Sequence, residues 1–185
     1  MLCSLALELD SNIGLETQKL LAMPRKLPSS PALLDRYDKA ILRLLQRDNR
    51  TAQRVIAESV ALSTAAVQRR IAAMEAAGVI AANVALVNPE AVSATITSIV
   101  EVLLHDESAA RVDAAKALFR ATPEVQQCYY VTGGSSFVLV IVAPDMRRYE
   151  RLTRLLFAEN PCVKSYRSLI ALDRVKTGGT ITIPD

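Results

Sequence analysis

Residues 95–104, Thr-Ile-Thr-Ser-Ile-Val-Glu-Val-Leu-Leu, contain the pattern on which the fold depends. From Ile96 to Leu104 every second side chain is apolar or small, and such alternation is typical of a β-strand with one buried face. The side chains expected to face inward are Ile96, Ser98, Val100, Val102 and Leu104. We therefore predict that this stretch is the first strand of a sheet.

The residues that follow alternate between helix and strand patterns. Residues 108–120 predict an amphipathic helix, and residues 125–131 and 137–143 predict two strands joined by a Gly/Ser turn. Pro144-Asp145 begins a second helix, and residues 163–175 predict the last strand. The inward helical residues are expected to be Val112, Ala115 and Phe119 in the first helix and Met146, Tyr149, Leu152 and Leu156 in the second.

The predicted order β-α-β-β-α-β is that of a ferredoxin-like domain, in which one antiparallel sheet carries two helices on the same face. The other face has apolar residues and no helix to cover it. An uncovered apolar sheet face favours association, so we expect residues 89–185 to form an α+β domain that pairs subunits into at least a homodimer.

Three short helical patterns precede this domain. Asp35 is a good N-cap for the first helix, and residues 51–60 suit the second. Ser63 is a good N-cap for the third helix, which runs to about Ala76 and is terminated by Gly78. The inward residues are expected to be Tyr37, Ile41, Leu44 and Leu45 in the first helix, Val55, Ile56 and Val60 in the second, and Val67, Ile71 and Met74 in the third.

These helices, with a connecting strand predicted over residues 79–87, indicate a helix-turn-helix domain over residues 32–88. Spacing alone leaves an ordinary three-helix subdomain as an alternative. The charge distribution favours DNA binding: residues 33–88 hold eight Lys or Arg against five acids, whereas residues 89–185 hold eleven of each. The whole net charge of +3 therefore lies in the helical part, as expected if that part meets a polyanion.

Cysteine and histidine usage excludes several classes of protein. Cys3, Cys128 and Cys162 lie far apart, which suits a reducing cytosol better than a disulfide framework and predicts a cytoplasmic protein. His105 is the only histidine, which excludes a multi-histidine metal site within one chain and argues against a histidine-based catalytic relay, so we expect neither metal nor cofactor. No apolar run reaches the ~20 residues of a membrane helix. Residues 1–31 end in a Pro/Ser-rich linker and predict an N-terminal tail.

Several short motifs follow one another along the chain. Those of the helical head are Leu34-Asp35-Arg36-Tyr37-Asp38-Lys39-Ala40-Ile41-Leu42, Ala61-Leu62-Ser63, Arg69-Arg70-Ile71 and Glu75-Ala76-Ala77-Gly78-Val79-Ile80. Those of the second domain are Pro123-Glu124-Val125, Cys128-Tyr129, Val131-Thr132-Gly133 and Pro144-Asp145-Met146. In this order and spacing they resemble the Lrp/AsnC (feast/famine) transcription regulators. The resemblance runs from about Leu33 to the C-terminus and implies a DNA-binding dimer, often assembled into tetramers or octamers, that responds to an amino acid or related metabolite.

The third helix carries the candidate DNA contacts. With Val67 inward, Ala65, Gln68 and Arg69 face outward, and a face of small residues can enter the major groove. Gln68 suits adenine and Arg69 suits guanine. Ser63 and Thr64 at the helix start, and Arg70 on its flank, are candidates for phosphate contact. The alternative for Arg69 and Arg70 is a solvated pair of charges.

The candidate effector site is the turn of Thr132, Gly133, Gly134, Ser135 and Ser136. The resemblance implies that effectors bind near this turn, which in the family commonly reads Gly-Asp-x-Asp-aromatic. Here both acids are missing, so we expect weaker selection for a ligand ammonium and more tolerance of neutral metabolites. A second departure is Ala61, which stands where Gly is common, and a left-handed Ala would cost about 1–2 kcal/mol, so we expect a reshaped turn.

Two other functions share this architecture. One is an enzyme similar to the sirohaem decarboxylases, which need histidines around a tetrapyrrole, and a chain with only His105 fits it poorly. The other is a metabolite-sensing module that has lost DNA binding, against which Gln68, Arg69 and Arg70 argue. The sequence therefore favours a sequence-specific transcription regulator that binds double-stranded DNA and is not an enzyme.

Overall fold

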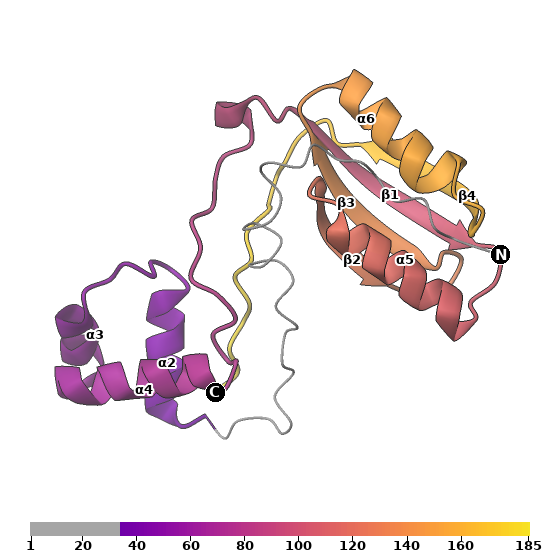
Figure 1. Ribbon diagram of the computed structural model, residues 1–185. Helices are drawn as coiled ribbons and strands as arrows, with labels where there is room; N and C mark the ends of the chain where they lie inside the picture. Colours follow the sequence, from indigo (N-terminus) through magenta and orange to yellow (C-terminus); the bar gives the residue numbers. More distant parts are fainter. Residues whose placement is uncertain (1–33) are drawn as a thin grey trace, which may run out of the picture. The chain divides into compact units, whose positions relative to one another are not determined.

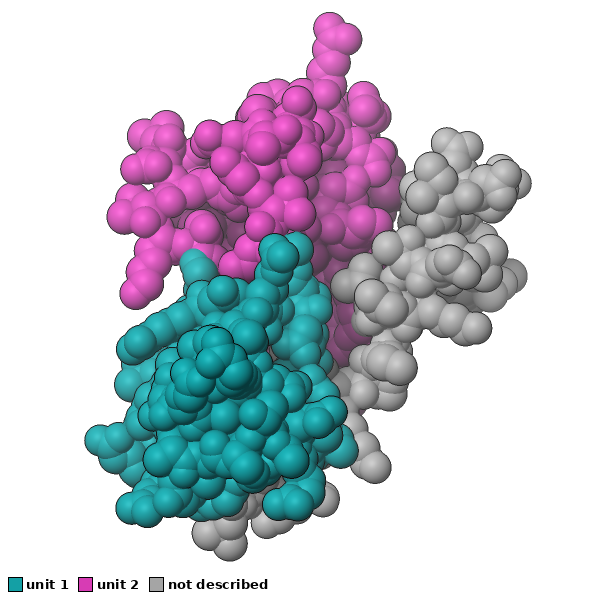
Figure 2. Space-filling view, turned by 90° about the vertical axis from the view of Figure 1, so that its left-hand side faces the viewer, with its two compact units in different colours: residues 1–85, 178–185 teal, residues 86–177 magenta. Residues whose placement is uncertain are grey.

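The computed structural model describes residues 34–185, so the tail predicted over residues 1–31 lies outside the described part of the chain. The described residues divide into two units, shown in different colours in Figure 2. One comprises residues 34–85 together with 178–185, and the other comprises residues 86–177. The last eight residues therefore belong to the helical unit, although the sequence analysis places them in the second domain.

The helical unit contains α2 (Arg36–Leu45), α3 (Gln53–Val60) and α4 (Thr64–Ala76). Asp35 caps α2 as predicted: its side chain accepts hydrogen bonds from the N–H groups of Tyr37 and Asp38, while the Asp38 side chain accepts one from the Asp35 N–H. Ser63 caps α4 by accepting from the N–H of Ala66. These reciprocal bonds satisfy donors that a helix start leaves unpaired.

A small apolar core holds the three helices together. Its buried members are Ile41, Leu42, Ile56, Ala57, Val60, Val67 and Met74. The prediction of Val55 as an inward residue is wrong, because Val55 is 44% exposed and Ala57, two residues on, is buried instead. A short helix of eight residues offers little periodicity from which to fix its rotation.

The turn between α3 and α4 keeps a left-handed residue without glycine. Ala61 has φ 54° and ψ 47°, and the N–H of Leu62 donates to the carbonyl of Ala57 at 3.0 Å. The expectation of a reshaped turn is therefore wrong. The buried residues on both sides, Val60 and Val67, hold the chain in this conformation in spite of its steric cost.

The strand predicted over residues 79–87 is not formed. Residues 81–88 have no regular structure, and Val84, Leu86 and Val87 are 63%, 84% and 64% exposed. A strand is stable only when its backbone pairs with a neighbour, and no such neighbour lies beside this segment among the described residues. A short 3₁₀ turn, η1 (Glu90–Val92), follows.

The second unit has the predicted β-α-β-β-α-β order (Figure 1). Its elements are β1 (Ile96–Leu104), α5 (Ala109–Ala121), β2 (Val125–Tyr130), β3 (Phe137–Ala143), α6 (Met146–Thr153) and β4 (Val163–Ile170). The strands form one antiparallel sheet in the order β2-β3-β1-β4. The α+β prediction is confirmed.

Both helices pack on the same face of the sheet. The predicted inward residues of β1 from Ser98 to Leu104 are buried, as are Val112, Ala115 and Phe119 of α5. The prediction of Met146 as inward is wrong, because this side chain is 52% exposed in the first turn of α6. After α6, the wider π-helical turn η2 (Arg154–Ala158) buries Leu156 and Phe157. β4 ends at Ile170 rather than Val175. Its ladder with β1 ends at the pair of Ser98 and Ile170, and only the Ala171 N–H still donates to β1, to the carbonyl of Thr97.

The opposite face of the sheet, here called the open face, changes character along the strands. Ile99 of β1 pairs with Val140 and Leu169, which forms an apolar row. Two residues along β1, Glu101 lies opposite Arg167 of β4. The open face is thus apolar at one end and charged at the end next to the turn between β2 and β3.

Candidate nucleic-acid interface and ligand site

The rotation of α4 determines which of its side chains reach solvent. Val67 is fully buried and Met74 is 4% exposed, so these two residues hold one side of the helix against the core. Five of the six predicted contact residues are exposed on or before the first turns: Ser63, Thr64, Ala65, Gln68 and Arg69. Within the part of the chain that the structure describes, Arg69 makes no ion pair, so its guanidinium is available to a ligand.

Arg70 differs from its neighbour. Its Nη1 lies 2.8 Å from a carboxylate oxygen of Asp35 and 2.8 Å from one of Asp38, and its guanidinium lies over the ring of Tyr37. Its side chain is 30% exposed and that of Asp38 is 14% exposed. Arg70 therefore joins α4 to the first turn of α2, which sequence reasoning did not foresee because the partners lie 32 residues apart.

Electrostatics in this cluster favour the charged forms of both groups. The backbone N–H of Asp38, together with Arg70, lowers the pKa of the Asp35 carboxyl below its ordinary value. Hydrogen bonds from the guanidinium to Asp38 and Asp35 raise the pKa of Arg70. The N-cap of α2 is thus ionised, as the positive end of a helix dipole prefers.

The second candidate site is the turn between β2 and β3. Thr132, Gly133 and Gly134 are exposed, Ser135 is half-buried, and Gly133 has a φ of +119°, which explains glycine at that position. Ser136 is completely buried. Its Oγ accepts a hydrogen bond from the N–H of Leu104 at 3.1 Å, so this hydroxyl supports the turn from within the sheet rather than facing solvent.

A cavity of about 180 Å³ opens beside this turn. It is lined by Gly134 and Ser135 of the turn, by Glu101 and Leu103 of β1, and by Ser165, Tyr166 and Arg167 of β4. The guanidinium of Arg167 binds the Glu101 carboxylate through two hydrogen bonds, Nε to Oε2 at 3.0 Å and Nη2 to Oε1 at 2.9 Å. Sequence reasoning missed both residues, because only the pairing of β1 with β4 brings them together.

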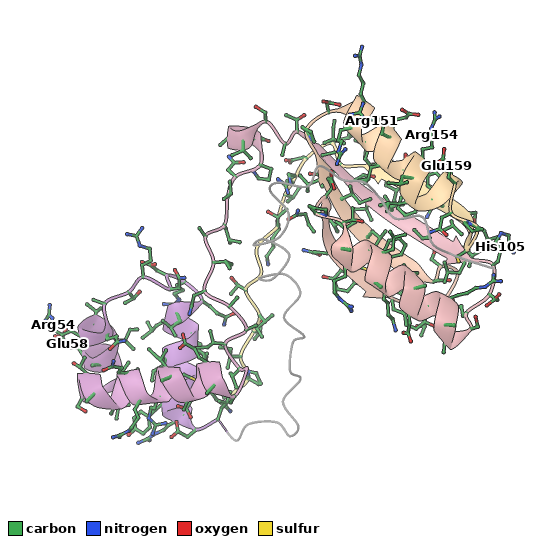
Figure 3. The ribbon with its side chains drawn as sticks, in the orientation of Figure 1. Arg54, Glu58, His105, Arg151, Arg154 and Glu159 are labelled. Carbon is green, nitrogen blue, oxygen red and sulfur yellow. The ribbon has the colours of Figure 1, made fainter. Side chains whose placement is uncertain are left out.

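The other sequence observations concern metals and membranes. No group of three or more His, Cys, Asp or Glu residues suited to hold a metal ion occurs among residues 34–185. Of the helices that the structure describes, none is long and apolar enough to cross a membrane. His105 lies exposed just beyond the end of β1 (Figure 3), and its N–H donates to the carbonyl of Cys162.

Comparison with known families gives two matches. Residues 34–81 match the winged helix-turn-helix DNA-binding family, and residues 97–181 match the Lrp/AsnC ligand binding domain. An uncharacterized HTH-type transcriptional regulator of Sinorhizobium fredii is 42% identical over 151 residues, which cover 82% of this chain and 88% of that protein. The leucine-responsive regulatory protein of Escherichia coli K12 is 28% identical over 150 residues, covering 81% of this chain and 92% of that one.

Solved structures agree with this assignment. An AsnC family regulator from Agrobacterium tumefaciens superimposes with a TM-score of 0.75 at 30% identity, over 80% of this chain and 97% of that one. A transcriptional regulator from Neisseria meningitidis, solved in complex with L-methionine, gives 0.72 at 30% identity over 80% of this chain and 96% of that one. These relatives are regulators rather than enzymes, and the chain belongs to the Lrp/AsnC family of DNA-binding transcription regulators.

Proposed function

We propose that the chain regulates transcription by inserting the exposed face of α4 into the major groove of its operator. The observation that carries this proposal is the burial of Val67 and Met74, which leaves Gln68 and Arg69 facing solvent. Gln68 can bond adenine and Arg69 can bond guanine through two hydrogen bonds each. Ala65, one turn before Arg69, allows the helix backbone to approach the bases closely.

Phosphate contacts come from the start of the same helix. Ser63 and Thr64 are exposed where the N–H groups of α4 point outward, a position that favours an anion. The Ser63 hydroxyl already accepts from Ala66 and retains its own proton to donate to a phosphate oxygen. Arg70, held by Asp35 and Asp38, contributes to binding by fixing the orientation of α4 rather than by touching DNA.

The regulatory domain, taken as residues 86–177, senses an amino acid or a related metabolite at the turn formed by Thr132, Gly133, Gly134 and Ser135. Support comes from the exposed backbone of this turn, the adjoining cavity and the related structure that contains L-methionine. Ser136 contributes by anchoring the turn to Leu104. The DNA-binding domain is the helical unit of residues 34–85 and 178–185, and the protein acts in the cytoplasm.

Two copies of the chain associate through the apolar end of the open face to form a homodimer. Ile99 and Leu169 are 39% and 44% exposed there, and burial of such a row favours pairing. A dimer also presents two α4 helices, as a palindromic operator requires. Tetramers or octamers would extend the same assembly.

The test is an electrophoretic mobility shift with the DNA upstream of the chain's own gene. Wild type should bind that DNA more tightly than a shuffled fragment of equal length, and a Gln68→Ala, Arg69→Ala double variant should lose this preference. Equal affinity of wild type for both fragments would refute sequence-specific regulation at this site. Sedimentation at micromolar concentration should show dimers or larger species for both proteins.

A further inference from the structure

The C-terminal segment, residues 178–185, returns to the helical head after the last strand of the second unit. β4 ends at Ile170, and residues 178–185 belong to the unit that contains residues 34–85. This segment is the yellow end of the chain in Figure 1. The head is therefore joined to the second unit by two stretches of chain, residues 81–95 and residues 171–177.

Two side chains of α2 and its C-cap hold the backbone of the C-terminal segment. The amide of Gln46 accepts from the N–H of Ile181 at 2.8 Å and donates to the carbonyl of the same residue at 3.2 Å. Nη2 of Arg43 donates to the carbonyl of Ile183 at 2.9 Å and lies 2.6 Å from the Asp185 carboxylate. Because three of these bonds go to backbone atoms, they fix the position of the segment along α2.

One apolar side chain anchors the segment. Ile183 is half-buried and packs against the core of the head, whereas Ile181 is 72% exposed and takes part only through its backbone. The remaining residues of the segment are exposed. Hydrogen bonds and apolar contacts of this size are individually modest, so the segment can detach while the helices of the head stay folded.

The docked segment leaves the DNA-reading face uncovered. Its contacts are with α2 and the core of the head. Ser63, Gln68 and Arg69 are exposed while the segment is in place. The segment is therefore compatible with DNA binding and does not mask the proposed base contacts.

We propose, building on the DNA-binding function proposed above, that the C-terminal segment is a strap that sets the spacing between operator half-sites. Fully extended, residues 171–177 reach about 25 Å at most, whereas residues 81–95 reach about 54 Å. The shorter connection limits how far the head moves from the end of β4. Arg43, Gln46 and Ile183 are the positioning residues of the strap, and they act through the position of the head rather than by contact with DNA.

Heads with restricted positions favour one operator geometry. A dimer of this kind binds two half-sites that lie about one helical turn, or a multiple of it, apart. Heads that are limited in advance lose less freedom on binding, so an operator of matching spacing binds more tightly and other spacings bind less well. A single half-site engages one head and is not affected. The strap therefore controls spacing, while Gln68 and Arg69 recognise the bases.

The experiment measures the affinity of the full-length protein for operators of different spacing. The half-sites come from the operator that the mobility-shift experiment identifies, and they are separated by inserts that increase one base pair at a time over a full helical turn. A single half-site is measured in parallel. Wild type should bind the best spacing about tenfold or more tightly than the worst.

A longer strap tests the tether without removing any of its contacts. Insertion of Gly-Ser-Gly-Ser between Thr177 and Gly178 should reduce the ratio between best and worst spacing to about threefold or less. Affinity for the single half-site and hydrogen exchange at the Ile181 amide should both stay at their wild-type values. These two readouts separate a tether from a segment that merely stabilises the head.

Two isoleucine variants form a matched pair. Ile183→Ser removes the apolar anchor and should relax the spacing preference as the longer strap does. Ile181→Ser changes an exposed side chain and keeps both backbone bonds to Gln46, so it should retain the wild-type preference. Equal spacing preferences in these two variants would contradict the proposal.

Other outcomes would also reject the strap. They are a wild-type spacing preference in the protein with the longer strap, or an equal loss of affinity for the single half-site and for the full operator in Ile183→Ser. Sequence-specific binding by wild type that tolerates every spacing would reject the strap and leave the proposed function standing.

Small-angle X-ray scattering reports on the head without DNA. The longer strap should increase the maximum dimension of the dimer relative to wild type, because each head then moves over a wider range. A failure of sequence-specific DNA binding would refute the proposed function, and the scattering comparison would still decide on the strap. Identical scattering curves for the two proteins would reject it.

Discussion

The Nη1 atom of Arg70 in α4 lies 2.8 Å from Oδ1 of Asp38 in α2, and the two side chains are only 30% and 14% exposed. The same Nη1 lies 2.8 Å from Asp35, the N-cap of α2. The consecutive arginines of α4 therefore differ in their surroundings, since Arg69 faces solvent and Arg70 fixes α4 to the first turn of α2.

Replacing Arg70 should weaken the head rather than the electrostatic attraction to DNA. Arg70→Ala should reduce the free energy of unfolding by about 1–2 kcal/mol, because Asp38 loses a charge-assisted hydrogen bond in a partly buried place. The dependence of log affinity on log salt should keep its wild-type slope. A double-mutant cycle with Asp38→Asn measures the coupling, and a flatter salt slope with unchanged stability would instead identify Arg70 as a phosphate ligand.

Replacing Arg69 should affect base recognition. Arg69→Ala should reduce operator affinity by about 1–3 kcal/mol and relax preference at one base pair, because a bidentate contact to guanine is lost. The matched control is Arg151→Ala on α6, an exposed arginine of the second unit (Figure 3). Operator selection with randomised half-sites makes the measurement, and unchanged preference at every position would contradict the assignment.

Glycine at position 61 should stabilise the head. Ala61 has a φ of 54°, a conformation in which a Cβ costs about 1–2 kcal/mol. Glycine removes this cost from the folded state, but it also gives the unfolded chain more conformational freedom, which offsets about half of the stabilisation. Ala61→Gly should therefore raise the free energy of unfolding by roughly 0.5–1 kcal/mol. Ala73→Gly, at an exposed site inside α4, should lower it by about 1 kcal/mol. Denaturant unfolding of both variants gives the comparison, and a less stable Ala61→Gly protein would contradict it.

An acid at position 136 should disrupt the sheet instead of restoring a charged effector turn. Ser136 is fully buried and its Oγ accepts from the N–H of Leu104, so Ser136→Asp forces a carboxylate into an apolar site. We expect a loss of several kcal/mol in unfolding free energy, of the order found for unpaired buried charges. Ser135→Asp, one residue earlier and half-buried, should be tolerated. Equal thermal midpoints for the two variants would show that Ser136 is accessible.

The C-terminal segment should depend on Gln46 for its position. The Gln46 side chain binds the backbone of Ile181 twice, accepting from its N–H at 2.8 Å and donating to its carbonyl at 3.2 Å. Ile183 packs against the core of the head, and Arg43 donates to its carbonyl at 2.9 Å. Gln46→Ala should speed hydrogen exchange at the Ile181 amide, with Gln53→Ala on α3 as control. Unchanged exchange would mean that Gln46 does not hold the segment.

Local patterns were sufficient for the helix caps and for the order of helices and strands along the second unit. The cap residues Asp35 and Ser63 act within three residues of themselves, and the alternation from Ile96 to Leu104 reports burial on one face of a strand. The rotation of α4, which decides that Gln68 and Arg69 face outward, also follows from the apolar spacing of Val67, Ile71 and Met74. These features depend on neighbours in the chain, so the amino-acid sequence by itself determined them.

The same kind of reasoning failed where a distant partner decides the outcome. Residues 79–87 have strand-forming side chains, but no neighbouring strand pairs with their backbone among the described residues. The local pattern of Ser136 predicts an exposed turn residue. Its hydroxyl is instead buried, where it accepts a hydrogen bond from the N–H of Leu104, 32 residues earlier. The position of Arg70 on the flank of α4 predicts a phosphate contact, whereas the folded chain places Asp38 next to its guanidinium.

The sequence by itself therefore determined the order of elements, the exposed face of α4 and the location of the turn between β2 and β3, because each depends on interactions over a few residues. Only the tertiary structure decided which charged side chains lie next to one another. Glu101 and Arg167 are 66 residues apart, and the register between β1 and β4 makes them neighbours at the edge of the turn. Coulomb interactions and hydrogen bonds act over a few ångströms of space, whatever the separation along the chain, and that spatial proximity exists only once the sheet has formed.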